Sequence, residues 1–232
     1  MNRETCYNAA MPRLEIAVTS LDDALQAQQG GADSIEISED LSVGGLTPTF
    51  DLVRQIREAM TIQVNVIVRP HAHSFNYTPT DIDTILADTA TLVQHQVDGI
   101  VFGALTPERH LDVELIKRVA QAAQHVPITI HRALDECANP EDALEALIGV
   151  APRVLTSGPA STAWEGRDGL KRWIESFGSH FSFVAAGSLR ADRLAEYDSY
   201  VQAHEYHFGS AARTDGKVDA HQVKHLRHIL TP

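Results

Sequence analysis

The chain has 232 residues, of which 44% are hydrophobic and 22% charged, and its formal net charge at pH 7 is −12. This length suits one large α/β domain with a sizeable core, and the acidic balance disfavours nucleic acid and anionic membranes as partners, since both select clustered cations. No apolar run approaches the roughly 18 residues of a transmembrane helix, and the two cysteines, Cys6 and Cys137, make no disulfide framework, so we expect a cytoplasmic protein.

Strands and helices alternate along the chain after a loose leader, residues 1–12, which has no apolar period. Each predicted strand is a short run in which β-branched or aromatic residues alternate with other residues. The intervening helices begin at capping residues such as Ser20 and Asn139, the latter followed by Pro140 in the first helical position. The predicted strands are residues 14–18, 34–38, 64–69, 99–102, 127–132, 153–156, 181–186 and 206–208.

This alternation, with no break in composition, predicts residues 13–232 as a single domain. Eight strands favour a closed (β/α)8 barrel of the TIM type. A doubly wound open sheet is the alternative, and its nucleotide-binding form has a glycine-rich turn after the first strand. Here that turn is Val18-Thr19-Ser20-Leu21, so the barrel is the fold class that we expect.

One face of the predicted strands has polar and charged residues where barrel interiors usually have Val, Ile and Leu. Buried charges are costly unless paired, so these groups should meet one another or a ligand at the carboxyl ends of the strands, where barrel active sites lie. We expect Arg69 to neutralise at least one inward glutamate; a satisfied polar core without function is the alternative. The candidate catalytic residues in this cleft are Glu15, Glu36, Arg69 and His131.

Three turns that directly follow predicted strands contain glycine beside serine. Glycine lets backbone N–H groups approach an anion, and the loops after the seventh and eighth strands are the usual phosphate site of such barrels. Ordinary turn chemistry is the alternative. The candidate anion-binding residues are Thr156, Ser157, Gly158, Gly187, Ser188, Gly209 and Ser210. No lysine follows a strand, which argues against Schiff-base chemistry.

The candidate metal ligands are imidazoles and one thiol. His131 and His207 lie on inner faces of strands, and Cys137 follows the strand of His131. Transition metals prefer such ligands, although a lone cysteine is more often inert. The sequence alone leaves the identity of a metal open.

In its motifs the chain resembles the copper homeostasis protein CutC family. The matching segments occur in order between residue 14 and about residue 213. They are Leu14-Glu15-Ile16, Gly30-Gly31-Ala32-Asp33-Ser34-Ile35-Glu36, Gly44-Gly45-Leu46-Thr47-Pro48, Val68-Arg69-Pro70, Val101-Phe102-Gly103-Ala104-Leu105-Thr106-Pro107, Ile130-His131-Arg132-Ala133 with Asp135, and Val154-Leu155-Thr156-Ser157-Gly158.

The resemblance implies a TIM-type barrel, a cytoplasmic location, a role in copper homeostasis, and a shared cleft that contains the four candidate catalytic residues and the 156–158 turn. Copper as a ligand is implied by the resemblance only. Many members have cysteine where this chain has Ala17 and Ser38, and thiolates there would suit Cu(I).

Two functional hypotheses follow. The first is copper ion binding or handling. The second is an enzyme on a small phosphorylated or carboxylated metabolite, in which Arg69 and the glycine–serine turns hold the anion while His131 and a glutamate move protons. The sequence leaves open whether the chain forms a homo-oligomer.

Overall fold

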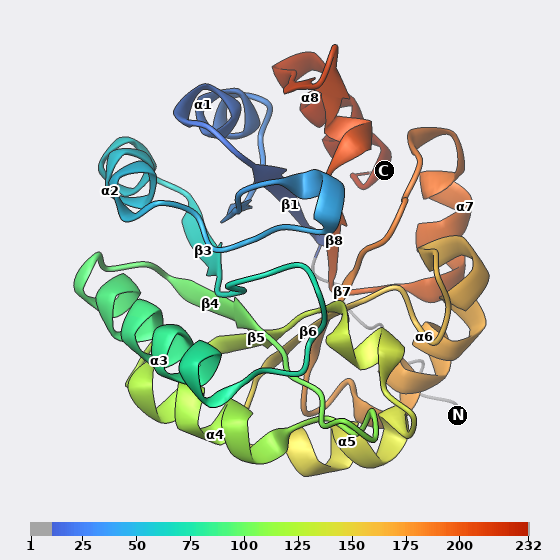
Figure 1. Cartoon of the computed structure of the whole chain (residues 1–232). Helices are drawn as coiled ribbons and strands as arrows, with labels where there is room; N and C mark the ends of the chain where they lie inside the picture. Colours follow the sequence, from blue (N-terminus) through green and yellow to red (C-terminus); the bar gives the residue numbers. More distant parts are fainter. Residues whose placement is uncertain (1–10, 232) are drawn as a thin grey trace, which may run out of the picture.

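A computed structural model describes residues 11–231, in which eight parallel strands close into a barrel in chain order (Figure 1). The first and last strands pair, with Glu15 opposite His207. The predicted (β/α)8 barrel is confirmed, and the open sheet is wrong. The strands are β1 (Arg13–Val18), β2 (Ser34–Ile37), β3 (Gln63–Ile67), β4 (Gly99–Phe102), β5 (Ile128–Ile130), β6 (Arg153–Thr156), β7 (Ser182–Ala185) and β8 (Glu205–Phe208). Most of the predicted leader, residues 1–10, lies outside the described residues.

The α-helices form a ring around the barrel (Figure 1). Thr78 begins one of them with a capping box, because its hydroxyl accepts the Asp81 N–H while the Asp81 carboxylate accepts the Thr78 N–H. Asn139 occupies the predicted N-cap position, but its side chain makes no capping hydrogen bond. The helices are α1 (Leu21–Gln29), α2 (Phe50–Ala59), α3 (Pro79–Gln94), α4 (Val113–Ala122), α5 (Pro140–Leu147), α6 (Ala163–Phe177), α7 (Ala191–Val201) and α8 (Ala220–Ile229).

Between residues 11 and 231, none of the helices combines the length and the apolar character that crossing a membrane requires.

The bounds of α7 were not predicted. Several short elements at the carboxyl ends of the strands were also not predicted. They are the 3₁₀ helices η1 (Leu41–Val43), η2 (Arg132–Glu136) and η3 (Ser210–Ala212) and the hairpin of β9 (Arg213–Thr214) with β10 (Lys217–Val218). Turns this short have no period that a sequence pattern could show. Because they follow β2, β5 and β8, they build the rim of the barrel.

The two faces of the strands differ in chemistry. Outward side chains such as Ile16, Ile35 and Val66 are fully buried in the main core, which they share with helix residues. The inner face has buried polar groups instead, and its separate apolar cluster consists of Leu155, Val184 and Ala186. The layer between sheet and helices therefore holds the apolar core, while the barrel interior carries the chemistry.

Gly166 allows α6 to pack closely on the turn after β6. A Cβ at Gly166 would lie 2.0 Å from the Ser157 carbonyl oxygen. We expect Gly166→Ala to lower the free energy of unfolding by about 1–3 kcal/mol, because the clash with backbone outweighs the gain in helix propensity. Gly209→Ala is the matched control, since a Cβ there meets no atom within 4 Å. Equal urea-unfolding curves for the two variants would contradict this prediction.

Candidate functional site

A cavity of about 890 Å³ opens at the carboxyl ends of the strands, within the size range of small-molecule sites. Glu36 on β2 and His207 on β8 line it, and so do Arg69 and His131, which come just after β3 and β5. Barrel active sites lie at this end, so the cavity is the candidate site. Of the four candidate catalytic residues, Glu15 alone does not line it.

Glu15 is fully buried and lies at the centre of a hydrogen-bonded network inside the barrel. Its Oε2 accepts hydrogen bonds from Ser34 Oγ at 3.2 Å, Asn65 Nδ2 at 2.6 Å and Arg153 Nη2 at 2.9 Å. Arg153 also donates from Nε and Nη2 to the two carboxylate oxygens of Glu205, at 3.1 and 2.9 Å. Arg153 therefore bridges two buried carboxylates.

The prediction that Arg69 neutralises an inward glutamate is wrong. Its Nη1 donates to the carbonyl oxygens of Val43 at 2.7 Å and Gly45 at 3.2 Å, and among the described residues it meets no carboxylate. The reason is height in the barrel. The side chain of Asn65 on β3 reaches Glu15. Arg69 lies four residues further along the chain, which is about 13 Å in an extended segment, so its guanidinium lies too near the mouth of the barrel to reach Glu15.

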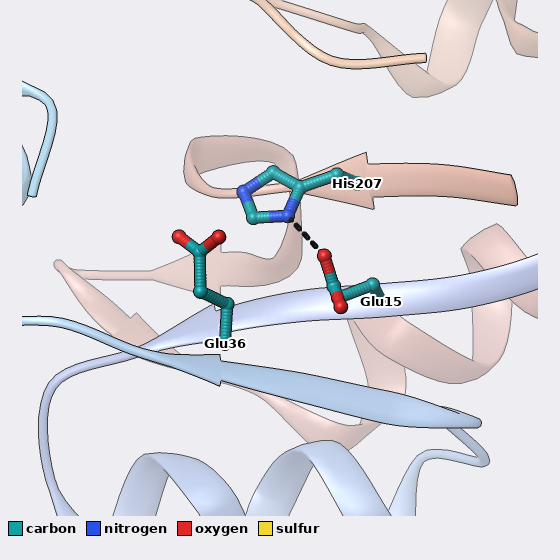
Figure 2. A group of neighbouring side chains, drawn as sticks. All are labelled: Glu15, Glu36 and His207. Atoms are coloured by element: carbon teal, nitrogen blue, oxygen red, sulfur yellow. Dashed lines mark hydrogen bonds and ion pairs between the residues drawn. The ribbon is translucent and has the colours of Figure 1, made fainter. Parts of the chain in front are cut away.

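Glu15, Glu36 and His207 form a compact group (Figure 2). The Nδ1 of His207 donates to Glu15 Oε1 at 2.9 Å, and Figure 2 shows the other ring nitrogen, Nε2, on the side of the Glu36 carboxyl. Potential ligand atoms of the three residues lie within 4.8 Å of one another. Glu15 thus orients the imidazole, while the Glu36 carboxyl makes no ion pair with any residue between 11 and 231.

These three groups shift one another's pKa values. Burial raises the pKa of Glu36 from 4.5 to about 7; the charge of Glu15 adds to the rise and His207 opposes it. Burial would also raise the pKa of Glu15, but Arg153 and the hydrogen bond from His207 hold it well below its ordinary value. Burial lowers the pKa of His207, yet the hydrogen bond to Glu15 and the nearby carboxylate charges raise it overall. Near neutral pH, Glu15 therefore stays ionised, whereas Glu36 can take up or release a proton.

His131 is a different kind of histidine. It is 5% exposed, its Nδ1 accepts the N–H of Ala133 at 3.1 Å, and its Nε2 has no partner among the described residues. Burial lowers the pKa of His131 to about 3, and the charges of Arg69 and Arg132 act in the same direction. The ring is therefore neutral at physiological pH and carries its proton on Nε2, which makes it a hydrogen-bond donor.

The turn Thr156-Ser157-Gly158 does not line the cavity, contrary to the prediction. The Ser157 N–H and Oγ donate to Asp135 Oδ2 at 3.1 and 2.7 Å, and the Thr156 hydroxyl donates to Asp135 Oδ1. The Gly158 N–H donates to Thr156 Oγ1 at 2.9 Å. The anion that this turn binds is thus the chain's own Asp135, which an external anion would have to displace.

The other candidate anion-binding residues do line the cavity: Gly187, Ser188, Gly209 and Ser210. Gly187 has a φ of +100° and Ser188 a φ of +56°, a conformation that glycine adopts without strain. Their two backbone N–H groups donate to no described backbone or side-chain acceptor. This loop can therefore offer donors to an anion, and the anion site stays a prediction.

The candidate metal ligands His131, His207 and Cys137 are not brought together. Cys137 ends η2 and does not line the cavity. In the described part of the chain, the one group of three potential ligands is Glu15, Glu36 and His207.

Four residues of the site were not among the candidates from the sequence: Arg153 in the inner network, and Arg132, Asp135 and Arg213 in the wall of the cavity, although Arg132 and Asp135 stand in the motif that carries the family resemblance. Arg153 occupies an inner-face position two residues before Leu155, so the alternation could have placed it inside the barrel. Arg132 and Asp135 lie in η2, where no strand period exists to indicate their direction. Arg132 contacts Asp135 at 2.8 Å.

The fold and the site together define a class: TIM-type barrels with a polar, ligand-sized cavity at the carboxyl ends of the strands. The family model described as the CutC family matches residues 12–212, and this chain belongs to that family.

Two relatives and one solved structure illustrate the match. The human copper homeostasis protein cutC homolog is 34% identical over 203 residues, which cover 87% of this chain and 74% of that protein. A family protein CutC of Glaesserella parasuis is 32% identical over 209 residues, covering 90% and 86%. The solved CutC structure from Streptococcus agalactiae has a TM-score of 0.81 at 22% identity, covering 86% of this chain and 99% of that one.

Proposed function

We propose that this chain is an enzyme that binds a small anionic metabolite in the cavity and transfers a proton with Glu36 and His207. One observation carries the proposal: the Glu36 carboxyl, which has no ion-pair partner among the described residues, lies beside an imidazole whose Nδ1 donates to Glu15. A general acid or base works best when its pKa is near the working pH, and burial raises the pKa of Glu36 to about 7.

The residues around this pair suit an anionic substrate. Arg69 places a buried cation in the cavity wall, and the N–H groups of Gly187 and Ser188 are available to an oxyanion. Glu15 fixes the tautomer of His207, so that Nε2 is the atom that gives or takes a proton. The substrate would therefore be held by its charge and react at a carbon or oxygen near Glu36 and His207.

A proton-exchange assay tests this function. Small carboxylates and sugar phosphates are incubated with the protein in D2O, and deuterium at carbon is followed by NMR. The wild type should label at least one compound, and Glu36→Gln should slow labelling by about 10²–10⁴-fold. Glu39→Gln, which changes an exposed acid outside the cavity, is the matched control. Labelling that persists unchanged in Glu36→Gln would contradict the assignment.

Copper handling is the second candidate, and the name of the human relative favours it. Cu(I) prefers thiolate and thioether ligands. Ala17 lines the cavity without a donor atom, Ser38 offers only a hydroxyl, and Cys137 lies outside the cavity. The residues present therefore do not fit Cu(I), while the carboxyl of Glu36 and Nε2 of His207 suit a divalent ion better.

We expect any copper binding to be divalent and weakened by acid, because protons compete for the imidazole of His207, whose pKa is raised above its ordinary value. Competition with a calibrated Cu(I) chelator should remove Cu(I) readily from the wild type. Cys137→Ser is the control for the thiol. Tight Cu(I) binding that survives this substitution would overturn the prediction; the other cysteine, Cys6, lies outside the described residues.

We also propose a location and a class of partner for the chain. We place the chain in the cytoplasm, where a free thiol such as Cys137 stays reduced. The partner is a small molecule or a metal ion, and assembly with further copies of the chain stays an alternative that sedimentation can decide.

A further inference from the structure

Buried polar side-chain atoms without a described partner concentrate in the segments that follow three of the strands, and two of these residues, Arg69 and His131, line the cavity. All but one of the buried side-chain polar atoms that lack a partner among the described residues belong to segments following β2, β3 and β5: Ser38 Oγ, Arg69 Nε, His71 Nδ1, Tyr77 OH and His131 Nε2. Buried polar groups are almost always hydrogen-bonded in folded proteins. Such a concentration indicates a place where a ligand supplies the missing partners.

One edge of the Arg69 guanidinium has N–H groups that are not fully hydrogen-bonded by the described residues. Both hydrogens of Nη1 are directed to the carbonyl oxygens of Val43 and Gly45, at 2.7 and 3.2 Å. On the opposite edge, Nε has no partner in the part of the chain that the structure describes, and Nη2 makes only a 3.5 Å contact with the Ala72 carbonyl. The N–H bonds of Nε and Nη2 run parallel, and this edge of a guanidinium binds the two oxygens of a carboxylate.

His131 is another buried donor in the wall of the cavity, and it packs against the same phenylalanine ring as Arg69. The Arg69 Cζ lies 4.7 Å from the centroid of the Phe75 ring, and the centroid of the His131 ring lies 4.8 Å from that Phe75 centroid. Because His131 Nδ1 accepts the Ala133 N–H, the neutral imidazole has its hydrogen on the unpartnered Nε2.

We propose that the Nε–Nη2 edge of Arg69 and the Nε2–H of His131 bind the carboxylate group of a small-molecule ligand. This inference rests on the proposed function for its catalytic meaning, and it names the class of substrate. A carboxylate fits better than a phosphate, since one guanidinium and a neutral imidazole provide one positive charge, and a second buried negative charge would be left unpaired. Phe75 is partly exposed and lies against both donors, so its ring must turn aside when the carboxylate enters.

Acetate is the probe, with uncharged acetamide as its control, both titrated in a chloride-free buffer and followed by the Arg Nε–H NMR signals. Acetate should shift the Arg69 signal, which is identified by its absence in Arg69→Met, whereas acetamide should not. Arg69→Met should weaken acetate binding at least tenfold. Arg132→Met is the matched control: Arg132 also lines the cavity but is already engaged by Asp135, so the affinity should stay within about twofold.

Phe75→Ala keeps both donors and removes the ring that covers them, so it should strengthen acetate binding severalfold even if Arg69→Met fails to fold. The inference is overturned if acetate and acetamide bind alike, if Arg69→Met binds acetate as the wild type does, if Phe75→Ala gains nothing, or if inorganic phosphate binds at Arg69 more tightly than acetate. Acetate binding should persist in Glu36→Gln. A wild type that binds acetate while Glu36 ionises near pH 4 would refute the proposed proton transfer and leave the carboxylate site standing.

Discussion

Replacing Arg153 by methionine should lower the free energy of unfolding by about 3–5 kcal/mol, because breaking a buried ion pair leaves an uncompensated charge. Arg153 contacts Glu15 and Glu205 at 2.9 Å each, and the two glutamate side chains are 0% and 6% exposed. Methionine has a comparable length and fills similar space, so the loss reports charge rather than a cavity. Urea unfolding at pH 7 measures it.

Arg190→Met is the matched control for this prediction. Arg190 also contacts a carboxylate at 2.9 Å, that of Asp192, but its side chain is 72% exposed. Exposed pairs contribute little to stability, so the control should unfold almost as the wild type does. If Arg153→Met were as stable as Arg190→Met, the inner network would not be the electrostatic centre of the barrel.

Replacing Glu36 by glutamine should make the protein more stable above pH 7. In the wild type the folded pKa of Glu36 is raised to about 7 from 4.5, so between these values the folded state keeps a proton that the unfolded state has released. Stability then falls as the pH rises, by about 3 kcal/mol over the whole interval. Glutamine does not ionise, so this loss disappears in the variant.

The stability difference between Glu36→Gln and the wild type should therefore be small at pH 4 and largest at pH 8. His207 also makes stability fall as the pH rises, since its raised pKa gives stability that is present below about pH 6.5 and lost as the pH rises through the folded value, but it does so in the wild type and in the variant alike. Glu39→Gln, an exposed acid, should follow the wild type at every pH. A difference that does not grow with pH would show that Glu36 ionises normally.

The period-two pattern made the barrel predictable. Residues such as Ile16 and Ile35 alternate with Glu15 and Glu36, so the sequence alone separated the helix-facing side from the inner side. The same pattern placed His207 on the inner face, where the structure brings it to Glu15.

Pairings between distant strands were not predictable in this way. Only Arg69 was expected to neutralise an inner acid, whereas Arg153 does so; which arginine meets the acids depends on height along the barrel axis, which strand register and stagger determine. Register places Arg153 opposite Thr129 and Ser182, in the layer of Glu15 and Glu205. The role of Asp135 was not predictable for another reason: it lies in η2, where the direction of a side chain follows from turn geometry rather than from a repeating pattern.

The most direct test of proton transfer is the pKa of Glu36 itself, measured by 13C NMR of the side-chain carboxyl between pH 3 and pH 9. The signal is assigned by its absence in Glu36→Gln. We expect a midpoint near 7, accompanied by a response of the His207 ring signals in the same interval because the two groups lie together. A midpoint near 4, with the His207 signals unchanged, would contradict the role of Glu36 in this site.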